Sequence, residues 1–242
     1  MFCISMPVFA QDNETGAEAG NAEEPARELS AAEKDILLPG HMDNIDEPVR
    51  IRYDFRRSGS FEDGFEDRVI HGCAGDTLMT APLPSDLDFF SGPHEVTFIQ
   101  KHNEENVMIN STIFIYLQGD VYEMTRLANR KPQLNFYFNK RIRHALVDDY
   151  EMETVEVPYD GGQVKATKYT ITPYAEDPNR VNYDKFADKR YEFVMSDEIP
   201  GKLYQIHTVI PDNVNKGAPP LIEETLTFAG TESPKQRSAK AD

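Results

Sequence analysis

The sequence predicts an α+β protein that is mainly β, with a large, curved antiparallel sheet (a half-barrel) and a helical pair over its concave face. Residues 189–228 alternate apolar and polar side chains in three successive runs separated by turn residues, as in an antiparallel meander with one buried face. Residues 120–147 instead carry apolar residues at helical spacing. Strand patterns on both sides of that segment favour one sheet of about eight to ten strands, and a sheet this wide twists and coils.

The first 47 residues divide into two segments. Residues 1–10 are apolar and end in Val8-Phe9-Ala10, the small-x-small pattern that signal peptidase accepts. We therefore expect a truncated signal-peptide remnant at 1–10 and a periplasmic or secreted protein. Residues 11–47 hold eleven acidic residues against two basic ones, a net charge of −9. This composition buries little apolar surface, so we expect an acidic, disordered tether, of which residues 11–40 are dispensable for folding.

A short helix inside this tether is predicted over residues 30–38. Ser30 and Glu33 have the spacing of a capping box, and Pro39-Gly40 provides a stop.

Strand patterns begin at Val49 and continue to residue 118. Val49, Ile51, Tyr53 and Phe55 alternate with charged residues, and residues 65–71 fit the partner strand. Residues 74–93 are rich in Pro, Gly and acids, which indicates an irregular excursion. Further strands are predicted from residue 96 to about 100 and over residues 107–118. The latter has a run that is apolar on both faces, which indicates a second covering layer.

The predicted cover is a pair of helices at about residues 120–147. Asp120 and Glu123 have the spacing of a helix cap and its third residue. After Pro132, a second helix over residues 133–147 places one apolar stripe at helical spacing. This stripe consists of Leu134, Phe138, Ile142 and Ala145.

The second half of the chain returns to strands. A hairpin is predicted over residues 154–172 around Asp160-Gly161-Gly162, followed by a polar loop over 174–189. In the meander, Pro200 and Gly201 suit the central positions of a type II turn, and Phe193 and Ile206 are expected to face the same core across that hairpin. One β-rich domain over residues 48–230 and a disordered tail over 231–242 complete the prediction.

Composition excludes several functional classes. The net charge of −17 and pI of about 4.7 disfavour nucleic acid as a partner, because its phosphates would be repelled. No apolar run approaches 18 residues, so no transmembrane helix is predicted. With Cys3 in the expected leader, Cys73 is the remaining thiol, and no internal disulfide framework is expected.

The sequence predicts neither an enzyme nor a cofactor. It contains no G-x-S-x-G, H-E-x-x-H, P-loop, G-x-G-x-x-G or C-x-x-C motif. His71 and Cys73 are two residues apart on a predicted strand, but two ligands do not make a zinc site. A hydrolase whose catalytic residues are dispersed in the sequence remains an open alternative.

Two features of the central segment bear on binding. Apolar residues of the doubly apolar run and of the second helix are candidates to line an apolar or lipid-like ligand: Ile113, Ile115, Leu117, Phe136, Phe138 and Ile142. Residues 120–147 also carry a net charge of +4, and a basic face on helices suits an anionic head group or an acidic partner. Its candidate anion-facing residues are Arg126, Arg130, Lys131, Lys140, Arg141 and Arg143.

The strand–helix–strand order resembles that of a known group of exported proteins. Together with residues 198–207 (EIPGKLYQIH) and 220–228 (PLIEETLTF), it is similar to bacterial proteins of unknown function whose half-barrel is like that of the periplasmic lipoprotein carriers. The likeness covers about residues 48–230 and implies a curved sheet enclosing an apolar cavity under a helical lid, with lipid or lipoprotein as the ligand. The alternative is an envelope scaffold or adaptor with a dry core, which binds a protein partner.

Overall fold

One antiparallel sheet of nine strands dominates the computed structural model, which describes residues 27–73, 85–91, 96–100, 110–128 and 134–233. The strand order is β4-β3-β2-β1-β9-β8-β7-β6-β5. The strands are β1 (Val49–Ser58), β2 (Phe65–Cys73), β3 (Ser85–Phe89), β4 (Val96–Gln100), β5 (Tyr150–Tyr159), β6 (Gly162–Ile171), β7 (Arg190–Met195), β8 (Leu203–Ile210) and β9 (Ile222–Glu232).

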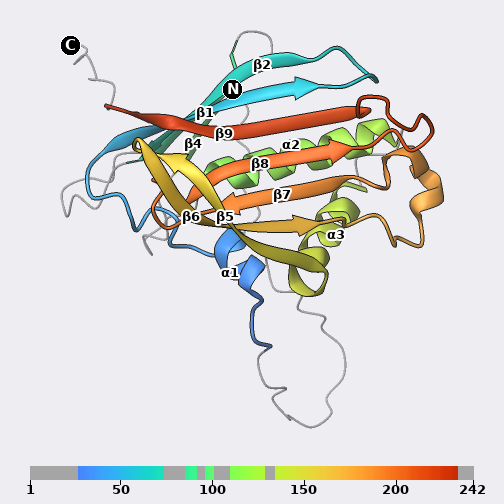
Figure 1. The fold of residues 1–242 in the computed structure, drawn as a ribbon, viewed down its shortest axis with the longest axis horizontal. Coiled ribbons are helices and arrows are strands. Elements are labelled where there is room, and N and C mark those ends of the chain that lie inside the picture. Colours follow the sequence, from blue (N-terminus) through green and yellow to red (C-terminus); the bar gives the residue numbers. More distant parts are fainter. Residues whose placement is uncertain (1–26, 74–84, 92–95, 101–109, 129–133, 234–242) are drawn as a thin grey trace.

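The helices form a second layer. Helices α2 (Ser111–Leu127) and α3 (Asn135–Asp148) lie behind the sheet in Figure 1, and the short helix α1 (Ala31–Leu37) lies beside the β5–β6 hairpin. The predicted fold class, a curved antiparallel sheet with helices on one face, is therefore confirmed.

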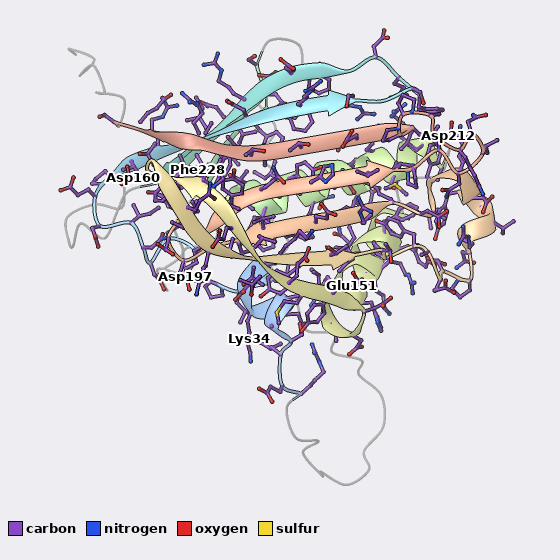
Figure 2. All side chains as sticks on the ribbon, viewed as in Figure 1. Lys34, Glu151, Asp160, Asp197, Asp212 and Phe228 are labelled. Carbon is purple, nitrogen blue, oxygen red and sulfur yellow. The ribbon has the colours of Figure 1, made fainter. Side chains whose placement is uncertain are left out.

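The sheet coils strongly at the β5 end. The rings of Tyr159 in β5 and Phe228 in β9 lie 5.8 Å apart, although β8, β7 and β6 separate the two strands in the sheet. In a flat sheet, four strand spacings would hold them roughly 19 Å apart. Figure 2 shows Asp160, at the hairpin tip, in front of the sheet near Phe228. The hairpin therefore curls over its neighbours.

The prediction that Phe193 and Ile206 face the same core is confirmed. Phe193 pairs with Ile206, and both side chains are fully buried. The Lys202 N–H donates to the Ile199 carbonyl at 2.7 Å, and Gly201 has φ +76°, as the third position of a type II turn requires. A Cβ at this glycine would come within 2.6 Å of the Ile51 side chain.

The predicted strand over residues 107–118 is wrong, because residues 111–127 form helix α2. Its N-cap is Asn110, whose side-chain oxygen accepts a hydrogen bond from the Thr112 N–H at 3.1 Å. Asp120 lies inside this helix and does not begin one. The helix is buried over a wide arc, so its apolar residues imitate a strand that is covered on both faces. The second predicted helix is confirmed as α3.

Four segments predicted as irregular are more ordered than expected. Residues 85–89 of the predicted excursion form β3, and the loop 174–189 contains two short 3-10 turns, η3 (Arg180–Asn182) and η4 (Asp184–Phe186). The predicted tether is wrong for its last part: the capping-box helix forms as α1, and its Ala32 and Ile36 are fully buried in the main core. The predicted tail begins too early, since β9 continues to Glu232. The expected leader at 1–10 lies outside the described residues.

Candidate functional site

The candidate site is the interface between the sheet and its helical cover. Along α2, one buried stripe is apolar and consists of Ile113, Leu117, Val121 and Met124. In the same main core, α3 contributes Phe138 and Ile142, which are also buried. Four of the six predicted ligand-lining residues are thus brought together: Ile113, Leu117, Phe138 and Ile142.

The other two predicted ligand-lining residues lie differently. Ile115 is partly buried and packs against the main core, whereas 70% of Phe136 is exposed. Phe136 therefore lies on the outer side of α3. It follows Asn135, the first residue of the helix, two positions ahead of the buried Phe138.

A second stripe of α2 is polar and equally buried. Lys189, just before β7, forms an ion pair with Asp120, and both side chains are 2% exposed or less. The other oxygen of Asp120 accepts the Tyr191 hydroxyl at 2.6 Å, and the hydroxyls of Tyr191 and Tyr174 lie 3.1 Å apart. Two charges removed from water are tolerable only when paired and hydrogen-bonded, and this pair meets that condition.

One turn earlier on α2, Tyr116 extends the polar contact to two further strands. Its hydroxyl donates to Glu224 of β9 at 3.1 Å and lies 3.1 Å from the Thr208 hydroxyl of β8. Burial raises the pKa of Glu224, as does the charge of Asp120, while Lys189 and Arg57 oppose them.

Arg57 of β1 continues this network toward solvent. Its guanidinium donates to Glu224 at 2.8 Å and to Glu123 of α2 at 2.7 Å, and Arg126 donates to Glu123 and Glu62. Burial acts to raise the pKa of Glu123, but the hydrogen bonds from Arg126 and Arg57 outweigh it and lower the pKa to about 2. We call the set of Arg57, Tyr116, Asp120, Glu123, Lys189, Tyr191 and Glu224 the polar latch, because it fixes α2 to strands β1, β7 and β9.

Two of the six predicted anion-facing residues, Arg126 and Arg141, are paired with acidic residues of the chain itself. Arg126 is paired with Glu123 and Glu62, and the Nε of Arg141 donates to the Pro173 carbonyl at 3.0 Å and lies 3.2 Å from Asp177. Lys140 and Arg143 lie exposed on α3, whereas Arg130 and Lys131 fall outside the described residues.

Sequence reasoning missed the polar latch. The sequence pattern predicts a helix cap at Asp120 and the end of a polar loop at Lys189, and no motif joins two residues that are 69 positions apart. Within the described ranges, no group of three or more His, Cys, Asp or Glu side chains is placed to hold a metal ion. No described helix is both long and apolar enough to cross a membrane.

Comparisons with known proteins give a likeness in structure but none in sequence. No family model matches the chain, and no curated protein matches it. Among solved structures, it is similar to a LolA superfamily protein from Nitrosomonas europaea, at 9% identity and a TM-score of 0.21, covering 80% of this chain and 90% of that one. At this score the likeness carries no functional conclusion, so function must be argued from the geometry above.

Proposed function

We propose that the protein is an exported, non-enzymatic binding protein that holds an apolar or lipid-like ligand between its sheet and helices α2 and α3. The supporting observation is how this cover is attached. Among the described residues, no backbone–backbone hydrogen bond joins α2 or α3 to a strand, so side chains alone hold the cover. The cover can therefore shift without breaking the strand ladder.

The structure corresponds to the closed form in this proposal, because side chains of the chain itself fill the interface. A ligand would have to replace contacts made by residues such as Leu117 and Phe138. The free energy of such an exchange is close to zero, because the acyl chain buries apolar surface in place of the surface that the helices no longer bury. Both areas contribute about 25 cal/mol per Å². The polar latch opposes displacement around Asp120, so we place the ligand toward Ile113 and Ile142.

A scaffold or adaptor is the second candidate, and the polar latch favours it. Separating Asp120 from Lys189 would leave two charges unpaired in a dry interface, which is strongly unfavourable. A cover fixed in this way suits a protein with a permanent core that binds a partner through its surface.

Mass spectrometry under native conditions, on protein purified from its own cell envelope, tests the first proposal. A co-purified lipid is expected, and a fluorescent fatty acid should then bind the delipidated protein. Ile142→Ala should change the affinity for this probe at least severalfold, because the residue is 2% exposed at the interface. Phe136→Ala is the matched control on the same helix and should leave it unchanged. Absence of both lipid and probe binding would favour the adaptor.

A further inference from the structure

Strand β5 forms one open edge of the sheet. It spans ten residues, and its one neighbour in the sheet is β6. An edge strand of this length presents a row of backbone donors and acceptors to which another chain can pair. The contacts, charges and surroundings of this edge indicate what kind of chain that is.

The turn at the hairpin tip determines which backbone groups face outward. Asp160 and Gly161 have φ of +48° and +76°, and Tyr159 pairs with Gly162 across them, as in a two-residue type I′ hairpin. The pair that closes such a turn is hydrogen-bonded, and pairs alternate from there. The groups that face away from β6 are therefore those of Tyr150, Met152, Thr154, Glu156 and Pro158.

These outward groups have no partner in the part of the chain that the structure describes. No backbone hydrogen bond outside the strand ladder involves residues 150–158. Pro158 fits this assignment, because proline lacks an N–H and is tolerated where that group would face solvent. The edge thus offers N–H donors at four successive outward positions and ends at a proline.

Charge indicates the chemistry of the partner. Residues 145–163 contain six acidic residues and neither lysine nor arginine. Glu151, Glu153 and Glu156 are exposed on β5 itself, and on β6 Lys168 pairs with Glu153 while Lys165 lies opposite Glu156. Like charges directly opposite each other destabilise strand pairing, so a second copy of β5 is a poor partner. A basic strand is a complementary one.

A polar cleft of about 400 Å³ lies beside this edge. Thr154 lines it from β5, and Lys165 and Thr167 from β6, with α1 and the β7–β8 turn opposite. Figure 2 shows Lys34 of α1 and Asp197 of that turn on this side of the molecule. Asp197 is 88% exposed, and Glu198 beside it is also exposed. Asp197 pairs with Lys202 at 2.9 Å, and Lys34 and Lys165 also line the cleft, so the exposed carboxylate of Glu198 is the one toward which a strand added to β5 would direct a side chain.

We propose that β5 binds an extended, basic segment of a partner protein as an additional strand, with alternate side chains over the polar cleft. Backbone hydrogen bonds to the outward groups supply affinity in this mode, and the acidic side chains and the cleft supply specificity. The proposal is independent of any ligand under the helical cover.

Amide hydrogen exchange on the full chain, with an acetylated ten-residue peptide of alternating Lys and Thr as the probe, tests this proposal. The peptide should slow exchange at Met152, Thr154 and Glu156, and a Glu/Thr peptide should not. Thr154→Pro removes one outward N–H without removing a bond to β6, and should weaken peptide binding about tenfold or more.

Charge variants provide a test that does not depend on the fold of the proline variant. Glu151→Gln with Glu156→Gln should weaken binding several-fold and reduce its salt dependence. Glu66→Gln is the control, since Glu66 is 77% exposed on the distant strand β2. Equal binding of both peptides, or binding without protection of β5 amides, would overturn the proposal. So would protection of these amides without peptide, which would assign the edge to a second copy or to the chain itself.

Discussion

Replacing Lys189 by methionine should destabilise the protein by about 3–5 kcal/mol, because it leaves the Asp120 carboxylate buried without its cation. The two side chains are 2% and 1% exposed, so the small values typical of surface ion pairs do not apply. Tyr191 still donates to Asp120, but one neutral hydroxyl does not replace an ammonium group. For a domain of this size, the loss corresponds to a melting temperature lower by about 6–20 °C.

Urea denaturation of four proteins gives the measurement: the native chain, Lys189→Met, Asp120→Asn and the double variant. The double variant should recover much of the loss, because removing both charges removes the unpaired group. Arg56→Met is the surface control. Arg56 and its partner Glu66 are 71% and 77% exposed, so Arg56→Met should lower the free energy of unfolding by less than about 1 kcal/mol. A Lys189→Met loss as small as that of the control, or additive effects in the double variant, would refute a buried, coupled pair.

Four further results are expected. Ile206→Ala should cost about 2–5 kcal/mol in urea denaturation, as a fully buried residue opposite Phe193. Ile36→Ala should cost a similar amount by the same assay, and no loss would restore the tether interpretation of α1. Burial lowers the pKa of His41 below its ordinary 6.5, so the unfolded chain takes up the proton first as the pH falls. The free energy of unfolding should therefore decrease below about pH 6.5. The His41→Gln variant should lack this contribution to the pH dependence. Lys140→Glu with Arg143→Glu should abolish any binding to anionic liposomes while the melting temperature is kept, if α3 faces anions.

The strands could be predicted because each carries its own local signal. Alternation in β1 and β7 and the turn residues at Gly161 and Gly201 act within a few positions, and these determine register directly. Helix α2 could not be identified this way. Its run from Ile113 to Leu117 is rich in β-branched and aromatic residues, and a short apolar run fits either a buried strand or a buried helix. The cap at Asn110 was the available signal for the helix.

The candidate sites depend on the order of the strands in the sheet and on tertiary contacts, which local sequence patterns do not predict. The hairpin around Gly161 was predictable, but the edge position of β5 follows from β9 lying between β1 and β8. The polar latch likewise requires β7 and β9 to meet the same face of α2. Burial of α1 depends on tertiary contacts too, since the Ser30 hydroxyl donates to the Leu146 carbonyl of α3 at 2.6 Å.

The net charge of a sequence segment does not predict the charge of the surface on which that segment lies. The +4 of residues 120–147 suggested a basic face, yet two of its arginines have acidic partners from outside that segment: Arg126 pairs with Glu62, and Arg141 with Asp177. Glu151, Glu153 and Glu156, by contrast, lie exposed on the edge strand β5, where Lys168 pairs with Glu153 and Lys165 lies opposite Glu156. Net negative charge therefore remains on β5, while Lys140 and Arg143 are exposed on α3. For this reason we expect the protein partner to be recognised at the sheet edge, while the helical cover is tested for an apolar ligand.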